Sequence, residues 1–171
     1  NFRAPVPDKA GVMKAVRIIL ELLVVAMLVC FAWWMGRGEL YRDLTAGEVC
    51  ETISDAARLS EMVHFGKNEF KKDYSLNANE YAGVEYYGYE DLMNSETVLV
   101  VKLADESQGA ELLSVIEARN EELAELFHSY SPENYDLLSH AVLKQEGGYL
   151  IYIVRDNAEE IYQVFHNNIK E

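Results

Sequence analysis

The sequence predicts an α+β domain that follows one transmembrane helix. Three observations lead to this fold class: an apolar run from Ile18 to Met35, alternating helix and strand patterns after Leu44, and a glycine turn between two late apolar stretches. We expect about four strands in the order ββαββα, forming an antiparallel sheet with helices over one face. The expected divisions are a cytoplasmic segment (1–15), a transmembrane helix (16–36), a stalk (37–43) and an extracytoplasmic domain (44–171).

The apolar run contains a single ionisable residue, Glu21. Its 18 residues would cover roughly 27 Å as a helix, close to the thickness of a hydrocarbon core. Four basic residues precede the run and only two follow it closely, so the positive-inside rule places the N-terminus in the cytoplasm. Trp33 and Trp34 suit the opposite interface, where indole rings favour the headgroup region.

Two other interpretations of this segment remain open. A cleavable signal peptide also combines a basic start with an apolar run, but here the run is long and bulky side chains fill Phe31–Met35, where small residues should precede a cut. A lipid-modified cysteine at Cys30 would need a small residue in place of Leu28-Val29. The chain begins with Asn1, so Met13 is an alternative start.

The first helix of the domain is expected to begin at a capping box. Thr45 and Glu48 have the spacing at which a hydroxyl and a carboxylate satisfy each other's backbone amides. We expect this helix to end near Leu59 and the irregular segment 61–79 to contain a short helix near 68–74. The apolar stripe of the first helix consists of Val49, Ile53 and Ala57.

Two strands are expected next, at Gly83–Tyr89 and at Thr97–Leu103, where β-branched residues dominate. The longest helix of the domain should span Ser107–His128, with its glutamates mostly on the solvent side. Pro132 then opens a short helical turn that reaches Leu138. The apolar stripe of the long helix consists of Leu112, Ile116, Leu123 and Phe127.

The chain should close with a hairpin and a helix. Ala141–Gln145 and Tyr149–Val154 are strand candidates joined at Glu146-Gly147-Gly148, because glycine accepts the positive φ of a tight turn. Asn157 and Glu160 repeat the capping pattern before the last helix. That helix should bury Ile161 and Phe165.

The domain is strongly acidic. Residues 36–171 carry 11 Lys+Arg against 27 Asp+Glu. Such a charge repels nucleic acid, so we expect no nucleic-acid partner. The simplest explanation of the charge is that it keeps the domain soluble beside a membrane. Cys30 and Cys50 lie in different segments, so no internal disulfide is expected.

No catalytic, cofactor or metal motif is visible in the chain. The four histidines lack the spacing of a zinc site, and Cys50 would be a nucleophile only if the fold brought a histidine to it. Gly83 and Gly88 do not have the spacing of a phosphate-binding loop. We therefore expect no cofactor and no metal, and we assign no catalytic residue.

The best candidate for a binding surface is the group Tyr86, Tyr87 and Tyr89. On a strand, Tyr87 and Tyr89 share one face while Tyr86 points to the other, so at least one side can expose rings. Aromatic surfaces with polar rims suit glycans or protein partners. The alternative is that one face is core and the other an ordinary edge.

The later part of the chain resembles a known family. The segment Phe127-His-Ser-Tyr-Ser-Pro-Glu-Asn-Tyr-Asp-Leu-Leu138, with Ala141-Val142 and Gly148-Tyr149 after it, is similar to the signature of the domain-of-unknown-function family DUF4358. The strand Glu96–Lys102 is similar as well, and the resemblance covers approximately 44–169. It implies an envelope protein of Gram-positive bacteria with an N-terminal signal, lipoprotein or membrane anchor, and it carries over no catalytic residue. The tyrosine-rich segment 81–89 departs from the family's more acidic middle section.

We therefore expect a membrane-tethered extracytoplasmic interaction or accessory module of the cell envelope. It would contact the cell membrane through its N-terminal helix and bind a protein or a cell-wall polymer. The alternative is an envelope enzyme or a glycan-binding accessory protein. An enzyme should show a concave pocket with convergent groups of perturbed pKa, whereas a binding module should show an exposed apolar or aromatic patch.

Overall fold

The computed structural model describes residues 9–35 and 41–170. Within the first helix, only the side chains of Met13 and of residues 17–31 are described. The chain divides into two compact units, 1–39 and 40–171. The first unit contains α1 (Lys9–Met35), a helix of 27 residues whose large apolar side chains are exposed wherever they are described. Within the described residues, no helix combines the length and the apolarity needed to cross a membrane. Most of the expected cytoplasmic segment and stalk, 1–8 and 36–40, lies outside the described residues.

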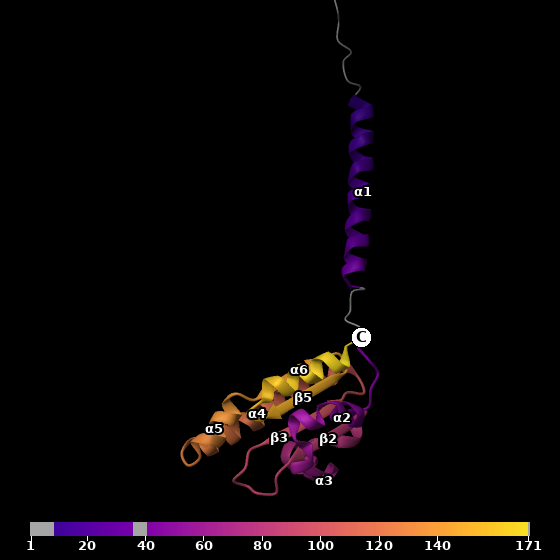
Figure 1. The fold of residues 1–171 in the computed structure, drawn as a ribbon. Helices are drawn as coiled ribbons and strands as arrows, with labels where there is room; N and C mark the ends of the chain where they lie inside the picture. The colour runs from indigo at the N-terminus through magenta and orange to yellow at the C-terminus, as the bar shows by residue number, and fades with distance from the viewer. Residues whose placement is uncertain (1–8, 36–40, 171) are drawn as a thin grey trace, which may run out of the picture. The chain divides into compact units, whose positions relative to one another are not determined.

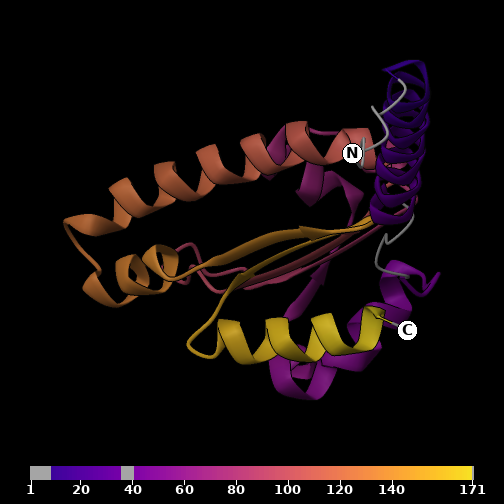
Figure 2. The same cartoon turned by 90° about the horizontal axis from the view of Figure 1, so that it is seen from above.

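The second unit has three layers, with helices on both sides of one sheet (Figure 2). The sheet has five antiparallel strands in the order β1-β2-β3-β5-β4. Helices α2 and α6 cover one face, and α3, α4 and α5 cover the other (Figure 1). In chain order the elements are α2 (Ala46–Ala57), β1 (Val63–Phe65), α3 (Lys67–Tyr74), β2 (Gly83–Gly88), β3 (Thr97–Lys102), α4 (Gly109–His128), α5 (Pro132–Ser139), β4 (Val142–Glu146), β5 (Tyr149–Val154) and α6 (Ala158–Ile169).

The α+β class is confirmed, but two details of the expected sheet are wrong. The sheet has five strands rather than four, because the short β1 pairs with β2 through Val63 opposite Gly88 and Phe65 opposite Tyr86. Helices cover both faces rather than one. The physical reason lies in the two central strands. Val98–Val101 of β3 and all of β5 are consecutive apolar residues and are buried, as is typical of strands that have helices on both sides.

The local signals of the sequence acted largely as expected. The amide of Thr45 donates to Glu48 Oε2 at 2.7 Å, and the amide of Glu48 donates to Thr45 Oγ1 at 3.2 Å, which completes the capping box of α2. Gly147 has a φ of +52° in the β4–β5 turn. Asn157 differs from the expectation, because its side chain does not cap α6. Its amide donates instead to the carbonyl of Ala56 at 3.0 Å, which ties the start of α6 to the end of α2.

The two faces of the sheet have separate apolar cores. On β3, Val98 and Val100 face α2 and α6, whereas Leu99 and Val101 face α3, α4 and α5. The first core centres on Val49, Ile53, Ile151, Ile161 and Phe165. The second centres on Phe70, Leu112, Ile116, Phe127 and Leu150. The expected stripes of the helices are therefore the buried ones, with Leu123 only partly buried.

The chain enters the domain beside its own C-terminal helix. Tyr41 forms a bridge with Lys170, and the amide of Arg42 donates to the carbonyl of Ile169 at 2.8 Å. The domain therefore begins a few residues before Leu44, within the segment expected as a stalk. At the opposite end lie the β2–β3 loop, the C-terminal turns of α4 and the helix α5 (Figures 1 and 2). We call this region, residues 89–96 and 123–139, the α4–α5 end.

Candidate functional site

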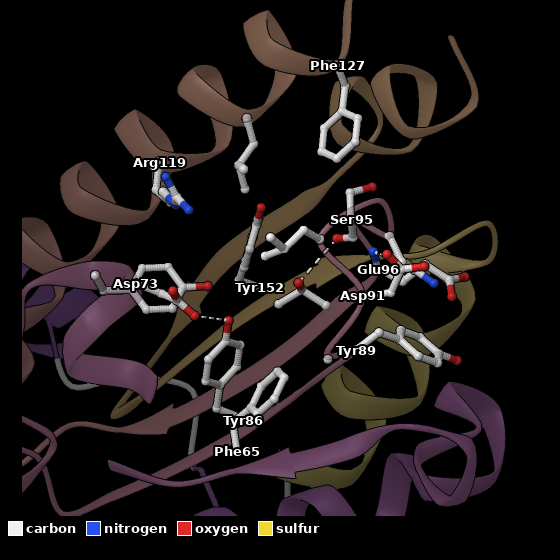
Figure 3. Close-up of a pocket in the computed structure, with 16 residues that line it drawn as sticks. Phe65, Asp73, Tyr86, Tyr89, Asp91, Ser95, Glu96, Arg119, Phe127 and Tyr152 are labelled. Carbon is white, nitrogen blue, oxygen red and sulfur yellow. Dashed lines mark hydrogen bonds between the residues drawn. The ribbon is translucent and has the colours of Figure 1, made fainter. Parts of the chain in front are cut away.

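A cavity of about 130 Å³ opens between the sheet and α4 at the α4–α5 end (Figure 3). Its floor is formed by Tyr86 of β2 and Tyr152 of β5, and α4 contributes Arg119 and Phe127 as a wall. The β2–β3 loop, from Tyr89 to Glu96, surrounds the mouth. Aromatic rings, hydroxyls, one cation and the carboxylates of Asp73, Asp91 and Glu96 thus line a single concave site.

Hydroxyl groups join the floor of the cavity to the helices around it. Tyr86 Oη donates to Asp73 Oδ2 of α3 at 2.8 Å, as Figure 3 shows. Tyr152 Oη donates to Asn120 Oδ1 of α4 at 2.8 Å, and the Asn120 amide donates to the carbonyl of Leu138 at 3.2 Å. The sheet, α3, α4 and α5 are therefore connected by polar contacts beneath the cavity.

These tyrosines remain protonated well above neutral pH. Burial is the main cause that raises the pKa of Tyr86 and of Tyr152 above 10.0, and the carboxylate of Asp73 adds to the effect at Tyr86. Burial likewise raises the pKa of Tyr74, which also lines the cavity. Such groups can donate and accept hydrogen bonds, but they do not act as bases at neutral pH.

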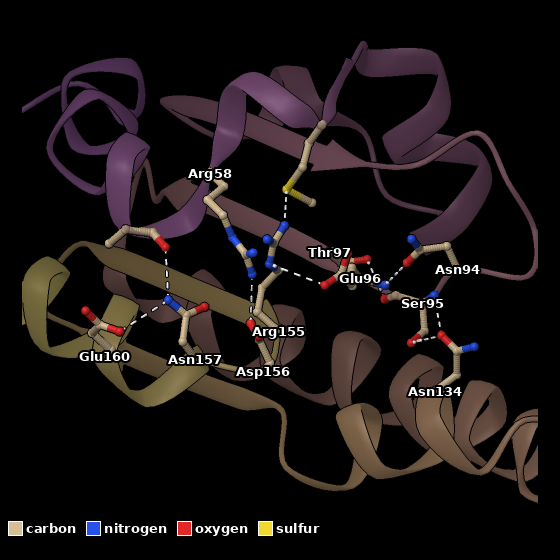
Figure 4. A network of polar contacts seen from close by, with 12 residues as sticks. Arg58, Asn94, Ser95, Glu96, Thr97, Asn134, Arg155, Asp156, Asn157 and Glu160 are labelled. Carbon is tan, nitrogen blue, oxygen red and sulfur yellow. Dashed lines mark hydrogen bonds and ion pairs between the residues drawn. The ribbon is translucent and has the colours of Figure 1, made fainter.

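The mouth of the cavity is held by a polar network (Figure 4). Asn134 of α5 accepts hydrogen bonds from the amide and the hydroxyl of Ser95, at 2.9 and 2.8 Å, and donates to the carbonyl of Met93 at 2.9 Å. On the other side of the loop, Glu96 lies 3.6 Å from Nε of the buried Arg155. The second half of the β2–β3 loop, residues 93–96, is therefore held by Asn134 of α5 and by Arg155.

The tip of this loop presents large apolar side chains to solvent. Leu92 is 89% exposed and Met93 is 55% exposed, and Tyr130, two residues after the end of α4, is 50% exposed. Leu126 and Tyr135 are exposed nearby along the chain. Because isolated soluble domains rarely expose grouped side chains of this size, the α4–α5 end is a candidate interaction surface.

The structure separates the three tyrosines of the predicted surface. Tyr86 is buried in the α3–α4–α5 core, where it forms the floor of the cavity. Tyr87 and Tyr89 are half-buried and pack against the opposite core, so the predicted division between the faces is correct. Tyr87 stacks on His64 with ring centroids 4.6 Å apart, and Tyr89 reaches the cavity mouth. Tyr86 is therefore not available to a macromolecular partner.

Several residues of the site were not anticipated from the sequence. Asp73, Arg119 and Tyr152 come from three elements that are distant in the chain, and no local pattern connects them. The pair Leu92-Met93 did carry a signal, because two large apolar residues stand in a loop between Asp91 and Asn94. A loop of that composition is unusual unless its apolar side chains contact something.

The groups considered for catalysis do not converge. Burial raises the pKa of the Cys50 thiol far above its usual range, so the thiol stays protonated. His64 pairs with Glu85 and His140 with Asp136. His166 pairs with Glu146, which also accepts a hydrogen bond from Tyr162, so these three groups meet at one place away from Cys50 and the other histidines. The hydrogen bond that the Tyr162 hydroxyl donates to Glu146 raises the pKa of Tyr162 to about 12. Across the described part of the chain, no three His, Cys, Asp or Glu side chains gather in a way that could hold a metal ion.

The comparison with protein families agrees with the resemblance found in the sequence. Residues 55–155 match the family described as domain of unknown function (DUF4358). The chain belongs to the DUF4358 family. The matched range of this DUF4358 protein contains every residue that lines the cavity. No curated protein and no solved structure matches the chain.

Proposed function

We propose that this DUF4358 protein is a membrane-tethered extracytoplasmic module of the bacterial cell envelope that binds a partner through its α4–α5 end. The observation that carries the proposal is the exposure of Leu92, Met93 and Tyr130 at one end of the domain. Exposed apolar and aromatic side chains of this kind mark interaction surfaces, because their burial against a partner is favourable.

The sequence supports the tether. Residues 18–35 form an apolar run with only Glu21 ionisable, and they lie within the 27-residue helix α1. The large apolar side chains described along α1 are exposed in the protein, and a bilayer would bury them. The excess of basic residues before the run supports a cytoplasmic N-terminus. The domain begins beside the C-terminal end of α6, where Tyr41 bridges Lys170, and not at the α4–α5 end.

A catalytic role has less support than a binding role. The buried groups with perturbed pKa are tyrosines and a cysteine that stay protonated at neutral pH, so they offer neither a base nor an activated nucleophile. A glycan ligand is the second candidate, because the rings of Tyr89 and Phe127 line the cavity beside hydroxyl groups and Arg119.

The binding role is tested by site-specific photocrosslinking in native membranes. A photoreactive amino acid replaces Leu92 in the full chain, and the matched control carries it at Glu51, an exposed residue of α2 on the other face of the sheet. We expect a defined adduct from position 92 and none from position 51. A protease-resistant adduct that a glycan hydrolase removes would favour the glycan candidate. Equal labelling from both positions, or none from position 92, would contradict the proposal.

The topology is tested separately on cells whose wall has been removed. Protease added outside should degrade residues 41–170 and leave an N-terminal fragment that stays in the membrane after alkaline extraction. A protected domain, or release of the intact chain by alkaline extraction, would contradict the tethered arrangement.

A further inference from the structure

We propose that the partner of the α4–α5 end is a basic amphipathic segment of another protein, with large apolar side chains flanked by lysine or arginine. This inference rests on the proposed function and names the chemical class of its partner. It is carried by two features of the same surface, the exposed apolar side chains and the carboxylates that surround them.

The apolar side chains come from two elements that the structure holds together. Leu92 of the β2–β3 loop and Phe127 of α4 line the same cavity, and Tyr130 packs against Phe127 with ring centroids 5.2 Å apart. The hydrogen bond from Asn134 to the carbonyl of Met93 holds the loop beside α5. The surface is therefore ordered before a partner arrives, which lowers the entropy cost of binding.

The rim of this surface is negatively charged. Between Tyr89 and Glu96 the sequence has no lysine or arginine, and between Arg119 and Ser139 its single one is Arg119. Arg119 is already paired with Glu122 at 2.7 Å. Asp91 and Glu133 line one hollow together with Met93. The exposed carboxylates within residues 89–96 and 123–139 are those of Glu90, Asp91, Glu125, Glu133 and Asp136.

These carboxylates favour a cationic partner. Among the ion pairs of the described residues, none engages Glu90, Asp91 or Glu133. A partner that covered the apolar side chains would bring these charges into a less polar environment, which is unfavourable unless the partner supplies opposite charges. Lysine or arginine beside the partner's apolar side chains meets that requirement.

The same charges disfavour other occupants. Anionic lipid headgroups, nucleic acid and anionic polymers would be repelled. A second copy of this chain would need a cationic surface, and the densest cluster of lysines in the domain is on α3, with Lys67, Lys71 and Lys72. Self-association through α3 is therefore the outcome that the experiment must separate from binding of another protein.

The first experiment measures binding of a synthetic leucine–lysine amphipathic peptide to the full chain in detergent. We expect saturable binding that weakens as salt is added, and no binding of the matched leucine–glutamate peptide. Two double variants, Leu92→Ser with Met93→Ser and Glu90→Lys with Glu133→Lys, should each weaken binding by about tenfold. The control, Glu51→Lys with Asp55→Lys on α2, changes the net charge equally and should alter binding by less than about twofold.

Urea denaturation of the same variants checks their folding. All six substituted positions are exposed, so the urea midpoints should be unchanged. Equal weakening by the α2 control would show that only net charge matters and would overturn the inference. The inference would also be overturned if the chain bound phosphatidylglycerol vesicles and the double variant Leu92→Ser with Met93→Ser lost that binding. Self-association of the chain that is lost in the double variant Lys71→Glu with Lys72→Glu would overturn it as well.

The second experiment identifies the segment that is crosslinked from position 92 in native membranes. A segment with net positive charge and large apolar residues supports the inference. A neutral or acidic protein segment would overturn the partner class while leaving the proposed binding function in place. The absence of any adduct from position 92 would count against the binding function itself.

Discussion

On the α2–α6 face of the sheet, the buried cluster is apolar apart from the Cys50 thiol and Tyr149, whose hydroxyl bonds to the backbone of Arg42 and Leu44. On the α3–α4–α5 face, Tyr74, Tyr86 and Tyr152 are buried around a cavity of about 130 Å³. Apolar side chains fill the space between the sheet and the helices on the first face, and the chain enters the domain beside this core, at Tyr41. The second keeps hydroxyls and open space next to an exposed apolar loop. Both faces bury large apolar side chains completely, so both contribute to stability. Only the second face combines this core with hydroxyls, open space and an exposed apolar loop.

The largest expected effect is on the α2–α6 face. Phe165 is fully buried there, so Phe165→Ala should leave a cavity and lower the free energy of unfolding by about 3–5 kcal/mol. The measurement is urea denaturation of the detergent-solubilised chain. Gln163→Ala, at an exposed position of the same helix, should change the free energy by less than about 0.5 kcal/mol. A loss below about 1 kcal/mol for Phe165→Ala would show that Phe165 does not lie in a close-packed core.

The second face should make the domain sensitive to alkali. The pKa values of Tyr86 and Tyr152 in the folded state are raised above 10.0, so their contribution to stability is complete below pH 10 and is lost as the pH rises toward the folded-state values. Above pH 10 the free energy of unfolding should fall with a slope that approaches about 1.4 kcal/mol per pH unit for each tyrosine.

Urea denaturation from pH 8 to pH 11 measures this loss. Tyr86→Phe and Tyr152→Phe should each make the decline shallower, because phenylalanine does not ionise. Tyr130→Phe is the control, since Tyr130 is half exposed. An identical decline in all four proteins would refute the assignment of alkaline sensitivity to the α3–α4–α5 face.

The smallest expected effect is on the loop at the cavity mouth. Asn134→Ala removes three hydrogen bonds that hold Met93 and Ser95, and it should cost about 1–2 kcal/mol of stability. Amide hydrogen exchange should accelerate in residues 93–96 and stay unchanged in α6. Asn167→Ala, an exposed substitution on α6, serves as the control. Unchanged exchange in the loop would mean that Asn134 does not order the cavity mouth.

Much of the fold could be predicted from neighbouring residues. The capping box at Thr45, the turn at Gly147 and the buried stripe of α4 each depend on residues within one or two turns of each other. The covering of both faces could also have been predicted, because Val98–Val101 and Tyr149–Val154 are apolar without alternation. The prediction treated these runs as ordinary strands of a sheet that is covered on one side.

Other features had no local signal. The three residues of β1 do not form a recognisable strand pattern, and they become a strand because β2 offers them an edge. The burial of Tyr86 rather than Tyr87 follows from the register of β2 against β3, where Tyr86 lies opposite Leu99. The cavity depends on residues from Phe65 to Tyr152, which only the completed sheet and α4 bring together.

The sequence by itself determined the α+β class, the positions of most helices and strands, the acidic charge and the apolar N-terminal run. These features depend on composition and on spacing between close neighbours. The tertiary structure alone decided the strand order, the burial of Tyr86 and the meeting of Leu92 with Phe127 at one end of the domain. Those features depend on contacts between residues far apart in the chain, and such contacts are set by the packing of the whole domain rather than by any local pattern.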